Sequence, residues 1–228
     1  MYENIIIIPY RHREAHLDYF IKHTVPLFQK YLPNTKVVVV EQNDGKLFNR
    51  GAVLNVGFKE YQNKTKYFFT HDVDINPTEK CIKEYYVNEV DEENVMGIYT
   101  SKHITLGGII KINDSTIHKI NGFPNDIWGW GNEDKALQNR TEYYNINKIT
   151  NLTNKYEHLE YILRFNDVDD RDKSNINENW YNNYVLFNKL NNEQKKELIM
   201  SSGLNNLEYT IIERKNIHDI VELIKVDI

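Results

Sequence analysis

Short apolar runs alternate with amphipathic segments along the first part of the chain. Ile5–Ile8 and Lys36–Val40 are β-branched runs, and Tyr67–Asp72 is an apolar run that turns polar at its end. Such continuous runs are typical of strands covered on both faces. The segments 14–31 and 49–59 between them have apolar residues at helical spacing. The order strand, helix, strand, helix, strand predicts a parallel sheet with right-handed crossovers.

Two prolines modify this pattern. We expect Pro9 to end the first strand, and Pro26 to kink the first helical segment. The second half of the chain gives a less regular pattern. Its expected elements are helices over Thr78–Val87, Glu133–Arg140 and Asn192–Ser201, the last ended by Gly203, strands over Val95–Thr100, Ile109–Ile112, Asn145–Leu152 and Tyr156–Tyr161, a long polar loop over Phe165–Tyr184, and a closing strand pair over Leu207–Glu213 and Val221–Val226.

The length and composition suit one globular domain, or one domain with a small lobe. The chain has 228 residues, of which 40% are hydrophobic, and its formal net charge is -5. This charge and the absence of a basic block argue against a nucleic-acid-binding protein. No stretch approaches the ~20 apolar residues of a membrane span. The single cysteine, Cys81, cannot form an internal disulfide, which favours a reducing compartment.

Two carboxylates stand at the end of the third apolar run. Asp72 and Asp74 are separated by Val73, and charges beside a buried strand are costly unless they are paired or bind a metal. Hard divalent cations take carboxylate oxygens and share their other positions with phosphates. The spacing therefore suggests a metal–diphosphate site. The alternative is that the two aspartates only start a turn before Pro77.

Basic residues are expected around the same crevice. Arg11, Arg13 and Arg50 follow strand ends or precede helix starts. In parallel α/β sheets the ligand crevice lies at the carboxyl ends of the strands. We therefore expect these arginines beside Asp72 and Asp74, where a metal–diphosphate ligand would need both signs of charge.

A Trp-Gly-Trp-Gly segment precedes two acidic residues. Trp128 and Trp130 alternate with glycines, and Glu133 and Asp134 follow Asn132, which we expect to cap a helix. Glycines let the backbone move or approach a ligand, so this segment suggests a sugar-binding surface. A packed surface turn before a capped helix is the alternative.

Several motifs together resemble one family. They are IIIIPYRHREAHL at 5–17, LFNRGAVLNVGF at 47–58, HDVDINP at 71–77, LGGI at 106–109, INGFPNDIWGWGNED at 120–134, RDKSN at 171–175 and SGLNNLEY at 202–209. The chain resembles the catalytic domain of the β-1,4-galactosyltransferases, which are inverting, Mn²⁺-dependent enzymes. The resemblance implies a GT-A-like α/β fold with a Rossmann-type mixed central sheet flanked by helices. It also implies a single domain over 1–228, with a donor-binding half about 1–110 and an acceptor half about 111–228.

The resemblance assigns roles to particular positions. Donor-site residues carried over from it are Pro9, Tyr10, Arg11, Arg13, Phe48, Arg50, Asp72, Val73, Lys102, Thr105, Gly107, Gly108 and Trp130. Asp74 would bind Mn²⁺ or, alternatively, Mg²⁺. Glu133 and Asp134 would be the catalytic pair that faces donor and acceptor, with Asp134 as the base. A carboxylate can deprotonate an acceptor hydroxyl, and the metal would neutralise charge on the departing diphosphate. The implied partners are a UDP-sugar donor and a saccharide acceptor.

The chain departs from the family pattern at a few places. Lys135 replaces the family's third acidic residue after the tryptophans. For the later metal ligand, His158 is our candidate, with Asp167 or Asp169 as alternatives. Thr105 stands where a tyrosine accompanies galactose donors, so the donor site is expected to accept UDP-galactose and UDP-N-acetylgalactosamine.

Location and mobility are also expected from these patterns. The family's membrane anchor and disulfide cysteines are missing. We expect either a shortened form of such a protein or, as the numbering from Met1 suggests, a soluble, cytoplasmic enzyme of a microbe or virus. Trp130 and the polar loop 165–184 are expected to close over the donor and exclude water.

Two other functions compete with transfer. One is an inactive carbohydrate or nucleotide-sugar binder on the same fold, which Lys135 leaves open. The other is a sugar-nucleotide pyrophosphorylase. The Gly-rich phosphate loop that such an enzyme needs is missing, because Pro9, Tyr10 and Arg11 follow the first apolar run.

Overall fold

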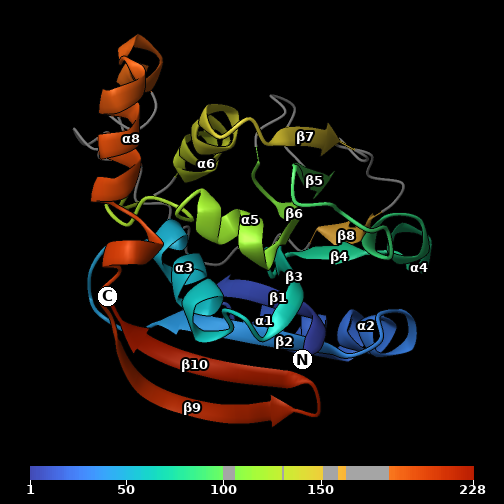
Figure 1. The fold of residues 1–228 in the computed structure, drawn as a ribbon. Coiled ribbons are helices and arrows are strands. Elements are labelled where there is room, and N and C mark those ends of the chain that lie inside the picture. The colour runs from blue at the N-terminus through green and yellow to red at the C-terminus, as the bar shows by residue number, and fades with distance from the viewer. Residues whose placement is uncertain (100–105, 130, 151–158, 163–184) are drawn as a thin grey trace.

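The computed structural model describes residues 1–99, 106–129, 131–150, 159–162 and 185–228. Its strands are β1 (Tyr2–Tyr10), β2 (Thr35–Gln42), β3 (Thr65–Thr70), β4 (Ile75–Pro77), β5 (Asn94–Tyr99), β6 (Ile109–Asn113), β7 (Asn147–Thr150), β8 (Leu159–Ile162), β9 (Thr210–His218) and β10 (Val221–Asp227). Eight of them form one sheet in the order β7-β5-β6-β3-β1-β2-β10-β9 (Figure 1). β4 and β8 form a separate antiparallel pair.

The strand directions make this a mixed sheet. β1 is parallel to both β2 and β3, and β10 is parallel to β2. β6 is antiparallel to β3 and β5, and β9 is antiparallel to β10. The predicted parallel arrangement of the first three strands is therefore confirmed. The predicted closing strand pair is also present, and its direction is antiparallel. The mixed α/β sheet is also the one that the family resemblance implied.

Helices cover both faces of the sheet. They are α1 (Glu14–His23), α2 (Val25–Tyr31), α3 (Arg50–Glu60), α4 (Glu79–Cys81), the π-helical turn η1 (Ile82–Tyr86), α5 (Asp114–Lys119), α6 (Glu133–Tyr143), the 3-10 turn η4 (Phe187–Lys189), α8 (Asn192–Ser201) and the 3-10 turn η5 (Leu204–Asn206). α3 lies beside α5 and below α6, whereas α1 and α2 pack near the N-terminal strands (Figure 1).

Two hydrophobic cores result from the alternation of side chains along the central strands. In β1, Ile6 and Ile8 pack with Phe20 and Phe28 of α1 and α2. Ile5 and Ile7 point to the other core, which contains α3. Successive strand residues face opposite sides of a sheet, so a continuous apolar run supplies both cores. This explains why Ile5–Ile8 contains no polar position.

The prediction that Pro9 ends the first strand is wrong. β1 continues through Pro9 to Tyr10, and Pro9 is opposite Val40 of β2. On the other side, the pairing of β1 with β3 has already ended at Ile7 opposite Thr70. Proline is tolerated in a strand where no neighbouring strand needs its missing N–H donor. Near Pro26 the predicted kink is a full break at Thr24, between α1 and α2.

Other helix predictions need smaller corrections. The helix expected over Thr78–Val87 is a single turn, α4, that continues into the π-helical turn η1. α5 follows β6 directly and was not predicted. Asn132 precedes α6 as expected, but its backbone is left-handed, with φ 75°, and its side chain makes no capping bond. The expected strand over Tyr156–Tyr161 lies partly outside the described residues, and its described part belongs to β8.

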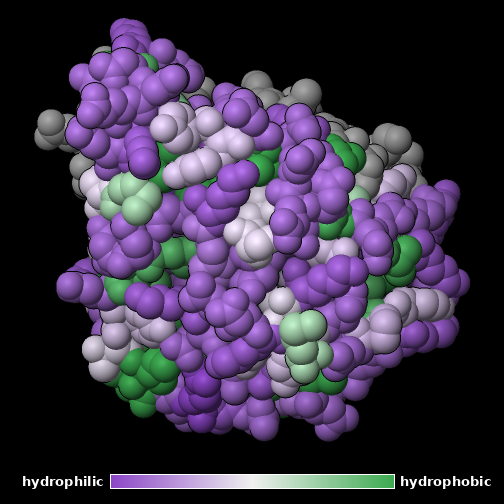
Figure 2. Space-filling view, in the orientation of Figure 1, coloured by the Kyte–Doolittle hydropathy of each residue, from purple (hydrophilic) through white to green (hydrophobic). Residues whose placement is uncertain are grey.

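The mean hydropathy of the chain is -0.64, a value typical of a protein with a polar surface. The face shown in Figure 2 is mainly hydrophilic, with apolar side chains in separate small groups. Within the described parts of the chain, the helices are too short or too polar to cross a membrane.

Candidate active site

Arg50 joins two acidic residues from distant segments. It is the first residue of α3, whose Asn49 cap accepts a hydrogen bond from Ala52 N at 2.9 Å. Arg50 Nη2 lies 2.8 Å from Asp72 Oδ1, and Arg50 Nη1 lies 3.3 Å from Glu133 Oε1. A cation at a helix N-terminus is disfavoured by the helix dipole, so the two carboxylates compensate it. The structure thus brings Arg50 next to Asp72, which the sequence placed near the same strand ends, and adds Glu133 from a distant segment.

The charges in this chain of contacts shift one another. Burial alone would lower the pKa of Arg50, but Asp72 and Glu133 raise it above its ordinary value. Burial raises the pKa of Glu133, and the charge of Asp134 adds to this effect while Arg50 opposes it. Arg50 therefore stays positively charged. The carboxylates of Asp72, Glu133 and Asp134 lie close enough to repel one another.

Asp74 lies beyond β3, and its negative charge is less well balanced by cations than that of Asp72. Its carboxylate is 3.5 Å from Arg13 Nη1, and about a third of its side chain, 34%, is exposed. Burial raises the pKa of Asp74, and the charge of Asp72 raises it further. A carboxylate in this setting is stabilised by additional positive charge. The oxygen donor and the excess of negative charge therefore fit a hard divalent cation. Among the described residues, no group of three or more metal-binding side chains occurs.

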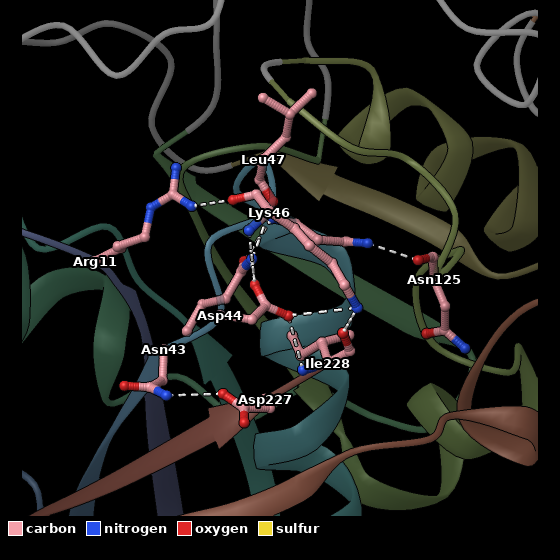
Figure 3. A network of polar contacts seen from close by, with 10 residues as sticks. Arg11, Asn43, Asp44, Lys46, Leu47, Asn125, Asp227 and Ile228 are labelled. Atoms are coloured by element: carbon pink, nitrogen blue, oxygen red, sulfur yellow. Dashed lines mark hydrogen bonds and ion pairs between the residues drawn. The ribbon is translucent and has the colours of Figure 1, made fainter.

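The loop after β2 is held in place by contacts with several segments. Arg11 Nη1 donates to the carbonyl oxygen of Lys46 at 2.6 Å (Figure 3). Its guanidinium lies 5.3 Å from the centre of the Phe48 ring. Asp44 accepts hydrogen bonds from Gln42 Nε2 at 2.7 Å and from the backbone N–H of Ile228 at 3.1 Å. The loop that presents Phe48 is thus held by the end of β2 and by the residue after β10.

Gln42 is a residue that the sequence patterns did not indicate. It is almost fully buried, at 1% exposure. Besides its bond to Asp44, it donates to Leu47 O at 3.0 Å and accepts from Asn49 N at 2.8 Å. One side chain thereby fixes the residues on both sides of Phe48, and Arg50 follows directly. The sequence signal that could have indicated Gln42 is its position as a polar residue just after the valine run 37–40.

Asp134 lies directly against the Gly107–Gly108 segment. A Cβ atom added to Gly107 would be 2.8 Å from Asp134 Oδ2, which is closer than real contacts allow. Asp134 Oδ1 accepts from the N–H of Lys135 at 2.7 Å. Gly108 has φ +78°, and a Cβ there would meet the carbonyl oxygen of Tyr99 at 2.6 Å. Gly107 thus leaves room for the Asp134 carboxylate, whereas Gly108 is required by its left-handed backbone and by the nearby Tyr99 carbonyl.

The family resemblance implies that Asp134 is the base of a sugar transfer. On that basis we predict that Gly107→Ala displaces Asp134 and lowers the transfer rate by about tenfold or more, because small misplacements of a catalytic group slow the reaction. The affinity for UDP should change much less. Gly45→Ala is the matched control, since a Cβ there meets nothing within 4 Å. Steady-state kinetics of both variants test this, and equal turnover in the two would contradict it.

Buried polar contacts anchor the helix that carries Glu133 and Asp134. Arg140 in α6 is 1% exposed. Its Nη1 donates to Asn121 O at 2.7 Å and to Gly122 O at 3.0 Å. Nη2 donates to Ser202 O at 2.5 Å. The guanidinium thus fastens α6 to two turns, one before the tryptophan segment and one after α8.

The tryptophan segment is tied to the Phe48 loop. Gly129 N donates to Phe48 O at 2.9 Å, and Lys46 Nζ lies 5.3 Å from the Trp128 ring centre. Gly129 and Gly131 have φ of 85° and 95°, values that favour glycine. The alternation of glycine in this segment is therefore a backbone requirement. Trp128 thus contacts Lys46 in the Phe48 loop.

His71 is fully buried behind the Asp72–Asp74 turn. Its ring packs edge-on against Phe20 and Phe28, with ring centres 5.3 and 5.9 Å away. Nδ1 lies 2.9 Å from Asp72 O, and Nε2 lies 2.9 Å from Tyr86 Oη. Burial lowers the pKa of His71 from 6.5 to about 4. His71 is therefore neutral at physiological pH.

This pKa predicts an acid-sensitive fold. In the unfolded chain His71 takes a proton near its ordinary pKa, whereas the native state resists it until about pH 4. Stability is thus lost as the pH falls between these values, by roughly 3 kcal/mol in total. Urea unfolding at pH 7 and pH 4.5 should show a smaller loss in His71→Asn than in wild type. An unchanged loss would contradict the assignment, and exposed His23→Asn is the control.

The remaining predicted site residues divide into two groups. Tyr10 and Val73 are buried in the core that contains Phe20 and Phe28, at 4% and 5% exposure, and burial raises the pKa of Tyr10 to about 12. The residues Lys102, Thr105, Trp130, His158, Asp167 and Asp169, and the loop 165–184, lie outside the described residues. Their roles remain predictions.

Comparison with known proteins gives consistent matches. Residues 1–87 match the N-terminal region of glycosyl transferase group 7, and residues 92–163 match the N-terminal domain of galactosyltransferase. Bovine β-1,4-galactosyltransferase 1 is 30% identical over 217 residues, which cover 91% of this chain and 50% of that protein. Human β-1,4-galactosyltransferase 6 is 35% identical over 164 residues, which cover 68% of this chain and 42% of that protein.

Solved structures share the fold. A Drosophila β-1,4-galactosyltransferase 7 mutant in complex with manganese, UDP-Gal and xylobiose superposes with a TM-score of 0.80. The match covers 100% of this chain and 94% of that chain, at 20% identity. The mixed sheet and its coverage by helices are therefore those of the GT-A class of glycosyltransferase folds.

The chain belongs to the β-1,4-galactosyltransferase family. It spans about half the length of the curated relatives that it matches. The expectation of a cytoplasmic enzyme from a microbe or virus is wrong, because these relatives are animal proteins.

Proposed function

We propose that this protein is a metal-dependent, inverting glycosyltransferase that moves galactose from UDP-galactose to a hydroxyl of a saccharide. The observation that carries this proposal is the joint placement of three features in a member of this family. Asp72 and Glu133 share Arg50, Asp74 stands with excess negative charge, and Asp134 lies beside Gly107 at the start of α6. Arginines and carboxylates at one crevice suit a ligand that combines a diphosphate with a cation.

The donor would occupy the crevice between the Phe48 loop and the turn after β3. Phe48, with Arg11 5.3 Å from its ring centre, offers an aromatic face and a cation for the uridine diphosphate. The Asp72 carboxylate is fixed by Arg50 and partly exposed, at 32%, so an oxygen remains available for a ribose hydroxyl. The manganese complex of the Drosophila relative supports the choice of Mn²⁺.

Asp74 would hold the cation. When bound, the cation would offset the negative charge that develops on the departing diphosphate. Arg13, at 3.5 Å from Asp74, would keep this carboxylate directed at the crevice. His158 is the proposed second ligand from the later segment, and Asp167 or Asp169 are the alternatives.

Asp134 would act as the base. Inversion requires one group that removes the proton of the attacking hydroxyl on the face opposite the leaving group. Asp134 stands in the first turn of α6, and Gly107 leaves its Oδ2 uncrowded. Glu133 is buried against Arg50, which leaves it as a structural partner rather than a proton acceptor.

Release of UDP from UDP-sugars tests the proposal. With Mn²⁺ and a panel of saccharide acceptors, UDP release should exceed the release without acceptor, and a chelator should abolish it. The proposal fails if UDP-galactose gives no acceptor-dependent release under any of these conditions. UDP-N-acetylgalactosamine in the same assay tests whether Thr105 admits the larger donor, and Thr105→Tyr should then restrict the enzyme to galactose.

A further inference from the structure

A chain of buried hydrogen bonds lies behind the turn that carries Asp72 and Asp74. A carbonyl oxygen can only accept, so the contact with Asp72 O places the ring proton of His71 on Nδ1. Nε2 then accepts from the hydroxyl of Tyr86. Each polar atom of the neutral imidazole thus has one partner, which fixes both the tautomer and the orientation of the ring.

Tyr86 is itself held on two sides. Its ring stacks on Phe69, with centres 5.4 Å apart and planes inclined by 15°. Its carbonyl oxygen accepts from Lys111 Nζ at 2.9 Å, and Lys111 also donates to Asn88 O at 2.7 Å. Lys111 is 2% exposed in β6. The contacts therefore connect a central strand, through η1, to the turn after β3.

These contacts reach the turn after β3 at the carbonyl oxygen of Asp72. The carbonyl oxygen of Asp72 accepts from His71 Nδ1 at 2.9 Å and from Ile75 N at 3.3 Å. These two bonds fix the peptide plane between Asp72 and Val73. Rotation of that plane would change the direction of both carboxylates, because Asp72 precedes it and Asp74 follows one residue later.

We propose that His71 is a positioning residue of the donor and metal site, and that Tyr86 acts through it. This inference rests on the proposed function, because the site it positions is the one proposed for Mn²⁺ and UDP. Neither side chain reaches the crevice, since both are 0% exposed. Their effect would be to hold Asp72 and Asp74 in the binding geometry before the ligand arrives.

Calorimetric titration of Mn²⁺ and UDP tests the inference. His71→Leu removes the donor to Asp72 O, and Tyr86→Phe removes only the hydroxyl and keeps the stacked ring. Each should raise the Kd of UDP, at saturating Mn²⁺, by about tenfold. His71→Asn should restore most of the affinity, because its amide N–H can take the place of Nδ1–H.

Tyr61→Phe is the matched control. Tyr61 is also buried and its hydroxyl bonds to Glu222, on β10, away from the crevice. This variant should lose stability and keep the Kd of wild type. If His71→Leu and Tyr86→Phe also lower only the Tm, the two residues are structural and the inference is wrong. If His71→Leu does not fold, Tyr86→Phe decides. If wild type itself does not bind Mn²⁺ and UDP, the proposed function fails instead.

Discussion

Asp134→Asn is expected to keep donor binding and to lower transfer by about two orders of magnitude or more. The asparagine is nearly isosteric, so it fits beside Gly107, where a Cβ would already lie 2.8 Å from Oδ2. It cannot accept the proton of an attacking hydroxyl. The loss should therefore appear in kcat, with little change in the Kd of UDP measured by calorimetry.

The control for this variant is on the same helix. Glu142→Gln removes one carboxylate near the other end of α6, where Glu142 is exposed and accepts from Gln138. Its transfer rate should equal that of wild type. Turnover near the wild-type value in Asp134→Asn would remove Asp134 from the role of base. An equal loss in both variants would point to damage of α6 as a whole.

Asp74→Ala is expected to abolish Mn²⁺-dependent binding of UDP without loss of stability. The Asp74 carboxylate is destabilised by burial and by the charge of Asp72, and the charges of Arg13, at 3.5 Å, and of His16 offset this in part. Removing it relieves repulsion in the free protein, so the Tm should stay the same or rise. A residue that lowers the stability of the free protein in this way is typical of a functional site.

Calorimetry with and without Mn²⁺ separates the two effects of this variant. Wild type should bind UDP more tightly when Mn²⁺ is present, and Asp74→Ala should bind it equally in both conditions. Asp219→Ala, in the exposed turn between β9 and β10, should behave as wild type. A Mn²⁺-dependent gain that persists in Asp74→Ala would show that the metal is bound elsewhere.

The local pattern of the sequence determined the framework of the donor site. The apolar runs Ile5–Ile8 and Lys36–Val40 could only be strands covered on both faces, and they are the paired centre of the sheet. The run at Tyr67–Phe69 placed Asp72 and Asp74 at a strand end. These inferences hold because side-chain burial on two faces of a strand depends on a few neighbouring residues.

Contacts between distant segments were decided by the tertiary structure. Arg50 and Glu133 are 83 positions apart, and their ion pair depends on how α6 packs against α3. Three other contacts also join distant segments. Gly107 leaves space for Asp134, Arg140 holds α6 to the turn at Asn121, and His71 supports the turn after β3. The antiparallel direction of β6 and the continuation of β1 through Pro9 also depend on which strands are neighbours.

The sequence by itself therefore determined the central strands, the α/β class and the acidic and basic residues near the strand ends. The tertiary structure alone decided which of these residues meet. The physical reason is that a strand's pattern is set by its own two faces, whereas an ion pair or a close backbone contact is set by the paths of two segments. Those paths result from the packing of both cores together.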